Sequence, residues 1–113
     1  MSSQETPKRA AQAWERAAEL FGVLSTPLRL HIISVLCGGE QNVTHLLSMI
    51  EASQPNMSRH LSVLYQAGVV AKRRSGQQVF YRIADESVVQ VCKAVCSQLG
   101  SGNAPANPQG QDS

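Results

Sequence analysis

The sequence predicts a mainly α-helical α+β fold with one β-hairpin, in the order α-α-α-α-β-β-α. Apolar residues recur at helical spacing through the first half of the chain, and hydroxyl residues followed by proline mark two helix starts. A run of β-favouring residues around a Ser-Gly turn then precedes a last amphipathic segment. The length of 113 residues fits one domain, since domains usually contain about 100–150 residues.

The two ends of the chain differ in composition from its middle. Residues 100–113 contain Gly, Pro, Asn, Gln and Ser with no large apolar side chain, and residues 1–7 are similarly polar. Such segments bury too little apolar surface to offset the entropy lost on ordering. We therefore expect a disordered N-terminus at 1–7, a folded domain at 8–99 and a disordered tail at 100–113.

Two helices are expected at the start of the domain. Lys8–Leu24 is rich in Ala, Glu and Arg, which favour helix. Its apolar stripe comprises Trp14, Ala17, Ala18, Phe21 and Leu24. Ser25-Thr26-Pro27 then offers a hydroxyl N-cap and a proline for the first turn, which predicts a second helix at Leu28–Cys37. Its apolar positions are Leu30, Ile33, Val35 and Leu36, and Gly38-Gly39 ends it.

A short third helix and a longer fourth helix follow. The third is expected at Thr44–Ala52, with Leu46, Leu47 and Ile50 facing inward. Ser53 is the N-cap of the fourth, and Pro55 lies in its first turn, where a missing N–H costs nothing. Gly68 ends this helix. Its buried edge, at spacing i, i+4, i+7, is formed by Met57, Leu61 and Leu64.

A β-hairpin and a last helix complete the order. The strands Val69–Arg74 and Gln77–Ile83 flank the turn dipeptide Ser75-Gly76. Val79, Phe80 and Tyr81 favour strand. Asp85 caps a last helix at Glu86–Leu99, before Gly100.

Positive charge is concentrated between Glu51 and Asp85, a stretch without acidic residues. Its basic residues are Arg59, Lys72, Arg73, Arg74 and Arg82. The whole chain has ten basic and eight acidic residues and a net charge of +2, so the remainder has five basic and eight acidic residues, a net −3. Segregated positive charge on a helix and hairpin is typical of a nucleic-acid-binding surface. A solvated basic face without a partner is the alternative.

A short helix, a tight connection and a Ser-capped helix make a helix-turn-helix, and the hairpin makes it winged. The second helix of such a unit enters the major groove with its N-terminal residues toward base edges. Gln and Asn can bond bidentately to adenine and Arg to guanine, whereas Ser and Arg also bind phosphates. The predicted DNA-binding residues are Gln54, Pro55, Asn56, Ser58, Arg59 and His60 on the helix, and Lys72, Arg73, Arg74, Ser75, Gly76 and Gln77 on the wing.

Four stretches in this order resemble the ArsR/SmtB family of bacterial repressors, over about Ala17–Leu99. They are Ser25–Arg29 (STPLR), Ser53–Leu64 (SQPNMSRHLSVL), Ala67–Val69 (AGV) and Arg73–Arg82 (RRSGQQVFYR). The resemblance implies a homodimeric winged helix-turn-helix repressor that binds an imperfect palindrome in double-stranded DNA and releases it on sensing an inducer. It also implies that the first and last helices pair across the dimer. Apolar stripes suited to this pairing include Trp14, Phe21, Val88, Val91, Val95 and Leu99.

Other classes of protein are less well supported. No apolar run approaches the ~20 residues of a membrane span, and the N-terminus lacks a signal peptide's apolar region. Three cysteines argue against a disulfide framework, so we expect a cytoplasmic protein with reduced thiols and no membrane contact. An enzyme, such as a thiol oxidoreductase using Cys92 and Cys96, lacks a Cys-x-x-Cys or βαβ pattern, and we expect no cofactor. A winged-helix protein-interaction module is the remaining alternative.

The resemblance does not define the inducer, because the sensing site moves between members. Two metal sites are common in the family. The site in the third helix needs thiols, and Asn42–Leu46 has none. The zinc site in the last helix needs histidines, and none follows Asp85. His31 and His45 are interpreted as surface or cap residues. The candidate sensing residues are therefore Cys37, Cys92 and Cys96.

Cys92 and Cys96, at i and i+4, share one helix face with Cβ atoms about 5–6 Å apart. A direct disulfide prefers ~3.5–4.5 Å, so a polysulfide bridge or a thiophilic atom such as As(III) fits better. Cys37 can join if the second and last helices pack together. Family members that sense reactive sulfur or oxidants carry one cysteine in each of these helices, which favours thiol modification. A metalloid site formed by Cys92 and Cys96, with or without Cys37, or plain core filling, is the alternative.

Overall fold

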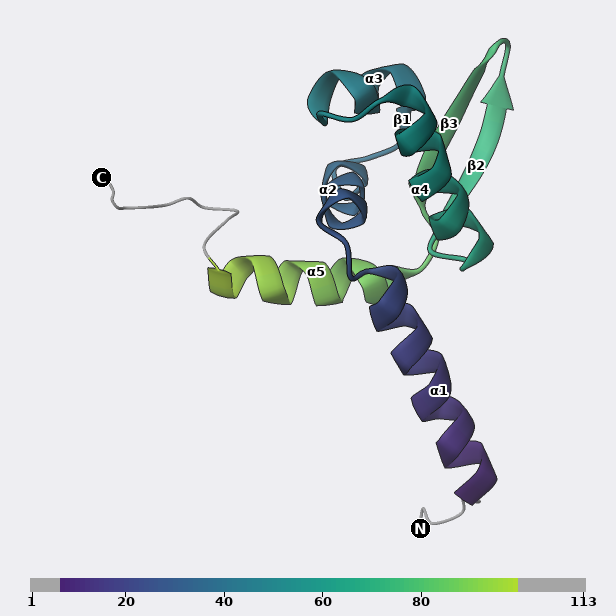
Figure 1. The fold of residues 1–113 in the computed structure, drawn as a ribbon, viewed down its shortest axis with the longest axis vertical. Coiled ribbons are helices and arrows are strands. Elements are labelled where there is room, and N and C mark those ends of the chain that lie inside the picture. The colour runs from purple at the N-terminus through teal and green to yellow at the C-terminus, as the bar shows by residue number, and fades with distance from the viewer. Residues whose placement is uncertain (1–6, 100–113) are drawn as a thin grey trace, which may run out of the picture.

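The computed structural model describes residues 7–99. Figure 1 shows the elements in chain order. They are α1 (Pro7–Val23), α2 (Pro27–Leu36), β1 (Gln41–Asn42), α3 (Val43–Met49), α4 (Gln54–Gln66), β2 (Val70–Ser75), β3 (Gln78–Ile83) and α5 (Glu86–Leu99). The mainly helical winged helix-turn-helix fold is confirmed. The first helix begins at Pro7, one residue before the expected boundary, and the rest of the predicted disordered segments, 1–6 and 100–113, lies outside the described residues.

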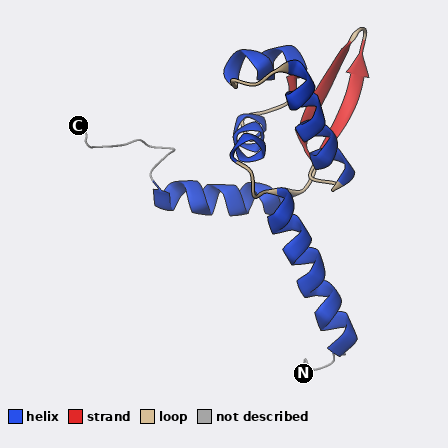
Figure 2. Ribbon diagram, viewed as in Figure 1, coloured by secondary structure: helices blue, strands red, loops and turns tan. Residues whose placement is uncertain are grey.

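The hairpin belongs to a three-stranded sheet with strand order β1-β3-β2, as Figure 2 shows in red. The strand β1 was not predicted, so the observed order is α-α-β-α-α-β-β-α rather than α-α-α-α-β-β-α. It pairs antiparallel with β3 through Gln41 opposite Tyr81 and Asn42 opposite Phe80. A two-residue strand has no alternation of polar and apolar residues, so the sequence pattern carries no signal for it.

The helix-turn-helix consists of α3 and α4. Asn42 caps α3 by accepting a hydrogen bond from the His45 N–H at 2.7 Å. This helix ends at Met49 rather than Ala52, because Ile50 is extended (φ −126°, ψ 128°) and buries its side chain in the core. Ser53 caps α4 as predicted, accepting from the Asn56 N–H at 3.2 Å. The predicted buried edge of α4, formed by Met57, Leu61 and Leu64, is confirmed.

The hairpin turn lies one residue further along the chain than predicted. Ser75 pairs with Gln78, so the turn residues are Gly76-Gln77 rather than Ser75-Gly76. Gly76 has φ +64°, a conformation that glycine adopts at no steric cost and that the first turn position of a tight hairpin requires. The need for a positive φ therefore decides which residues form the turn.

The hydrophobic core lies between α2, α3, α4, the sheet and the start of α5. Its buried members are Leu24, Ile32, Ile33, Leu36, Leu46, Ile50, Met57, Leu61, Leu64, Val69, Val70, Val88 and Cys92. Of the apolar positions of the second helix, Leu30 is 43% exposed, whereas Ile32, which was not named among them, is completely buried. The second helix is apolar almost all round, so periodicity does not select its buried face. Thr26, rather than Ser25, caps it through the Arg29 N–H at 3.1 Å.

The helices α1 and α5 extend away from this core in different directions (Figure 1). No residue of α1 is buried in the described protomer. Only its C-terminal end reaches the core, through Leu20 and Val23. Across the described residues, no single helix is long and apolar enough to cross a membrane. Only α1 and α2 taken together have that length and apolar character, and they are bent by 92° at their junction.

Candidate nucleic-acid interface and thiol cluster

The N-terminal half of α4 presents polar side chains beside the wing. Gln54, Pro55, Ser58 and Arg59 are exposed, and Asn56 and His60 are half-buried. The Arg59 guanidinium donates a hydrogen bond to Asn56 Oδ1, one helical turn away. Two predicted base-reading side chains are therefore already paired with each other. The remaining N–H donors of Arg59 and the amide N–H groups of Asn56 are not used by this contact.

His60 accepts a hydrogen bond from Arg29, a residue that the site prediction did not include. Arg29 Nε donates to His60 Nδ1 at 3.2 Å, and Arg29 Nη1 donates to the Val23 carbonyl at 2.9 Å. Burial lowers the pKa of His60, and the nearby charges of Arg29 and Arg59 lower it further. His60 is thus neutral at pH 7 and accepts at Nδ1, so its ring proton is on Nε2.

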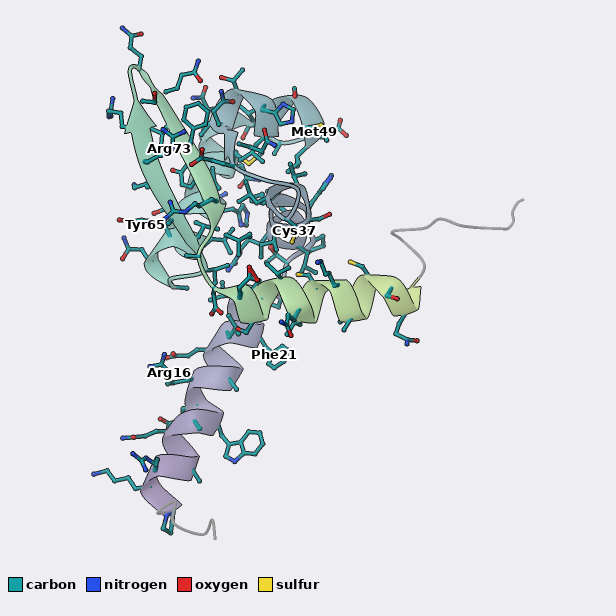
Figure 3. All side chains as sticks on the ribbon, turned by 180° about the vertical axis from the view of Figure 1, so that it is seen from behind. Arg16, Phe21, Cys37, Met49, Tyr65 and Arg73 are labelled. Carbon is teal, nitrogen blue, oxygen red and sulfur yellow. The ribbon has the colours of Figure 1, made fainter. Side chains whose placement is uncertain are left out.

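The three consecutive basic residues of the wing divide between the two faces of the hairpin, because side chains alternate along a strand. The Lys72 ammonium lies 4.4 Å from the centre of the Tyr65 ring on α4. Arg73 points to the other face and lies 4.8 Å from the centre of the Phe80 ring. Arg74 and the tip residues Ser75, Gly76 and Gln77 are exposed. Figure 3 shows Arg73 and Tyr65 on the wing side of the molecule.

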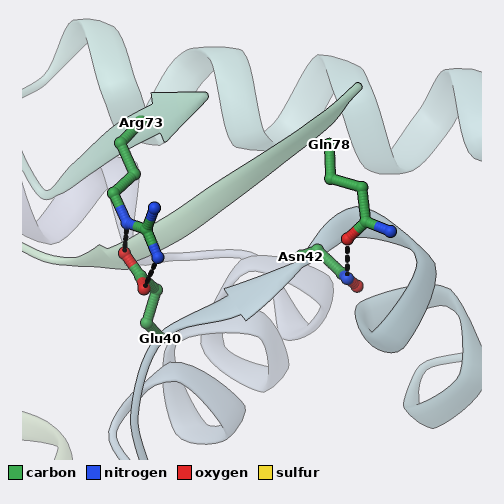
Figure 4. Close-up of polar contacts among 4 residues, drawn as sticks. All are labelled: Glu40, Asn42, Arg73 and Gln78. Atoms are coloured by element: carbon green, nitrogen blue, oxygen red, sulfur yellow. Dashed lines mark hydrogen bonds and ion pairs between the residues drawn. The ribbon is translucent and has the colours of Figure 1, made fainter. Parts of the chain in front are cut away.

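Arg73 also forms a two-point ion pair with Glu40. Its Nε and Nη2 atoms each lie 2.8 Å from one of the Glu40 carboxylate oxygens. Figure 4 shows this pair and, at the other end of β1, the Asn42 amide donating to Gln78 Oε1 at 2.6 Å. The hydrogen bond from Arg73 lowers the pKa of the Glu40 carboxyl. Sequence reasoning missed both contacts, which join residues more than thirty positions apart.

The three cysteines lie near one another where α2 packs on α5, and Figure 3 labels Cys37 among them. All three are free thiols: Cys37 at the C-terminal end of α2 is exposed, Cys92 is buried and Cys96 is half-buried. Burial raises the pKa of Cys92, and the neighbouring Cys37 and Cys96 raise it further. The second and last helices are in contact. This is the condition under which Cys37 can act together with Cys92 and Cys96.

The electrostatic surroundings of Cys37 are mixed. Burial raises the pKa of its thiol, and Cys96 and Glu86 act in the same direction, while the Lys93 ammonium opposes them. Lys93 follows Cys92 in sequence, but its charge acts on Cys37 across the helix contact. Within residues 7–99, no group of three His, Cys, Asp or Glu side chains is arranged to hold a metal ion.

Large apolar side chains remain exposed on the two projecting helices. Trp14 is 75% exposed and Phe21 58% on α1, and Val95 is 50% exposed on α5. Of the other residues expected at a dimer interface, Val88 instead packs in the core of its own protomer, and Val91 is half-buried. The side chain of Leu99 lies outside the description. The two most exposed large apolar side chains of the described residues, Trp14 and Phe21, thus both lie on α1.

Known proteins match this chain along most of its length. The family model described as "Bacterial regulatory protein, arsR family" matches residues 26–72. The biofilm growth-associated repressor of Xylella fastidiosa (strain Temecula1) is 35% identical over 95 residues, or 84% of this chain and 80% of that protein.

Solved structures show the same arrangement of elements. Reduced HlyU from Vibrio cholerae superposes with a TM-score of 0.75 at 27% identity, over 80% of this chain and 96% of that one. The homodimeric winged helix-turn-helix DNA-binding domain of a possible ArsR-family transcriptional regulator from Mycobacterium bovis gives a TM-score of 0.75 at 26% identity, over 88% and 92% of the two chains.

Proposed function

The chain belongs to the ArsR/SmtB family of bacterial transcriptional repressors, and we propose that it is a homodimer released from its operator by modification of its cysteine thiols. The modifying agent is a reactive sulfur species or an oxidant. The observation that carries this proposal is the gathering of Cys37, Cys92 and Cys96 at the contact between α2 and α5.

The proposed operator contacts follow from exposure on α4 and the wing. Gln54, Asn56, Ser58 and Arg59 face the base edges in the major groove, with Pro55 in the first turn and His60 presenting Nε2. Lys72, Arg74 and the tip residues Ser75, Gly76 and Gln77 contact the backbone or minor groove. Arg73 was predicted as a further contact, but its ion pair with Glu40 favours a different role.

Dimerisation through α1 and α5 is supported by the exposed Trp14, Phe21 and Val95. Aromatic rings of this size dominate the energetics of protein interfaces. The relative from Mycobacterium bovis is described as homodimeric. A two-fold dimer would present two α4 helices to half-sites about 34 Å apart, one turn of B-DNA, which matches a palindromic operator.

The proposed chemical step joins α2 to α5 through sulfur. With a peroxide, Cys37 and one α5 thiol give up two protons and two electrons, form an S–S bond and reduce the peroxide to two molecules of water. With hydrogen disulfide, one thiol first becomes a persulfide and releases H₂S. The persulfide and the second thiol then form a trisulfide bridge while another hydrogen disulfide is reduced to two H₂S. The longer bridge tolerates a wider separation of the two Cβ atoms.

Helix α2 provides a route from this bridge to the DNA-binding surface. It carries Cys37 at its C-terminal end and Arg29 in its first turn, where Arg29 hydrogen-bonds to His60 of α4. A ten-residue helix is a short rigid rod, so pulling its end toward α5 displaces the other end against α4. Binding then weakens because the released arrangement is favoured by the bridge.

A metalloid such as As(III) bound by the same cysteines is the alternative inducer. It is less well supported, because the described residues of one protomer offer no three-ligand cluster. Fluorescence anisotropy on promoter DNA, with reduced protein and then polysulfide, peroxide or arsenite, tests the proposal. Release by polysulfide or peroxide is expected, release by arsenite alone would replace the thiol-modification step, and no DNA binding by reduced protein would contradict the proposed repressor.

A further inference from the structure

We infer that Arg73 is a positioning residue of the wing and that Glu40 is the group through which it acts. The Glu40–Arg73 ion pair and the Asn42–Gln78 hydrogen bond together fix the hairpin on the helix-turn-helix, so Arg73 itself does not contact the operator. This inference rests on the proposed function, because it assumes that the wing meets DNA.

The ion pair fixes one edge of the Arg73 guanidinium on Glu40, while the side chain as a whole is still 51% exposed. Both nitrogen atoms on one edge of Arg73 donate to Glu40, each at 2.8 Å. The same group stacks over Phe80, its partner across the two strands. A planar guanidinium paired in this two-point manner is more rigid and more strongly bound than a single-contact pair. Arg73 would have to break both hydrogen bonds to turn this edge of the guanidinium toward a phosphate.

The two polar contacts connect the wing to the first helix of the helix-turn-helix. Asn42 is the N-cap of α3 through its Oδ1 atom and the donor to Gln78 through its Nδ2 atom. Glu40 lies directly before the same strand, β1. The strand β1 is thus joined to the hairpin by ladder pairing and by a side-chain contact at each end. On the other face of the hairpin, Lys72 lies over the Tyr65 ring of α4. The hairpin therefore contacts the helix-turn-helix through both of its faces.

The charge balance of the wing supports the same assignment. Both arginines are exposed, but the positive charge of Arg73 is matched by Glu40, whereas Arg74 lies on the opposite face of the strand. A phosphate contact releases counterions and contributes about 0.9 to the slope of log K against log salt concentration. A residue that only orients the wing contributes nothing to that slope. Salt dependence therefore separates a positioning role from a contact role.

The direction in which Glu40→Gln changes operator affinity distinguishes a positioning role of Arg73 from a DNA-contact role. If Arg73 were a DNA contact restrained by a competing carboxylate, removing the negative charge would free Arg73 and tighten operator binding. We expect the opposite, a several-fold loss of affinity, because the wing loses its orientation. Affinity that is unchanged or higher in Glu40→Gln would overturn the inference.

Arg73→Ala and the matched variant Arg74→Ala complete the test. Arg73→Ala should lower affinity without changing the salt slope, whereas Arg74→Ala should reduce the slope by about 1. Glu40→Gln in the Arg73→Ala background should cost nothing further. A slope reduced equally in both arginine variants would contradict the positioning role. Failure of the wild-type chain to bind promoter DNA would instead refute the proposed function, and thermal melting identifies any variant that does not fold.

Discussion

The Arg29 guanidinium donates a hydrogen bond from Nε to Nδ1 of His60 at 3.2 Å and thereby joins the first turn of α2 to the recognition helix α4. The same side chain donates to the Val23 carbonyl at the end of α1. One residue thus connects three helices, of which one bears Cys37 and another the proposed base contacts. This arrangement makes α2 the element most suited to carry a change from the thiols to DNA.

The Arg29–His60 contact predicts a specific loss of stability in mild acid. Because the folded-state pKa of His60 is lowered, the protein gains stability from neutral His60 above its unfolded pKa of about 6.5, and this gain is lost as pH falls below that value. Thermal melting between pH 7 and 5.5 should show a smaller decline in His60→Gln, whose amide oxygen can accept from Arg29 without titrating. An identical decline in both proteins would refute this.

Arg59→Ala should weaken operator binding while leaving the fold intact. Arg59 is exposed, and its recorded partner is the neighbouring Asn56 side chain. Losing its bidentate contact with a base would cost about 1–3 kcal/mol of discrimination, while no core contact is removed. A gel-shift assay and a melting curve check the two parts. Normal binding by a folded Arg59→Ala protein would show that a different face meets the DNA.

Trp14→Ala with Phe21→Ala should weaken the proposed dimer. Each ring is mostly exposed in the protomer, and burying one in an interface contributes a large share of association energy. Sedimentation should show dissociation, accompanied by loss of operator affinity because two half-sites are no longer bound together. Met49→Ala, on the exposed surface of α3, is the control and should remain dimeric. A dimer that survives the double substitution would place the interface elsewhere.

Cysteine variants should separate DNA binding from induction. Cys37→Ser, and the double variant Cys92→Ala with Cys96→Ser, should bind the operator like reduced wild type but resist release by polysulfide or peroxide. Alanine is preferred at position 92 because a hydroxyl buried without a partner is destabilising. Anisotropy with and without the agent measures both properties. If the double variant were still released, the α5 thiols would be core residues without a sensing role.

The local parts of the fold could be predicted from the sequence because their signals are local. Ser53 and Pro55 mark the start of α4, and the spacing of Met57, Leu61 and Leu64 identifies its buried edge. The short strand β1 and the early end of α3 could not be predicted. Both depend on tertiary packing, in which Ile50 leaves the helix to fill the core and Gln41 pairs with Tyr81.

The candidate site divides in the same way. The exposed face of α4 follows from helical periodicity, and the basic run of the wing is plain in the sequence. The surroundings of its three consecutive basic residues differ because side chains alternate along the strand and because Glu40, 33 positions before Arg73, lies beside one of them. Likewise, Cys92 and Cys96 are neighbours by helical spacing, but the approach of Cys37 depends on how α2 packs on α5.

The most direct test of the central claim is to map the sulfur bridge in protein that polysulfide or peroxide has released from DNA. Trypsin cleaves after Lys93, so the three cysteines fall on separate peptides: Leu30–Arg59, Ile83–Lys93 and Ala94–Ser113. We predict a non-reduced species that joins the Cys37 peptide to one of the two others, at a yield that rises with the released fraction. Released protein whose Cys37 peptide stays unlinked would contradict the account.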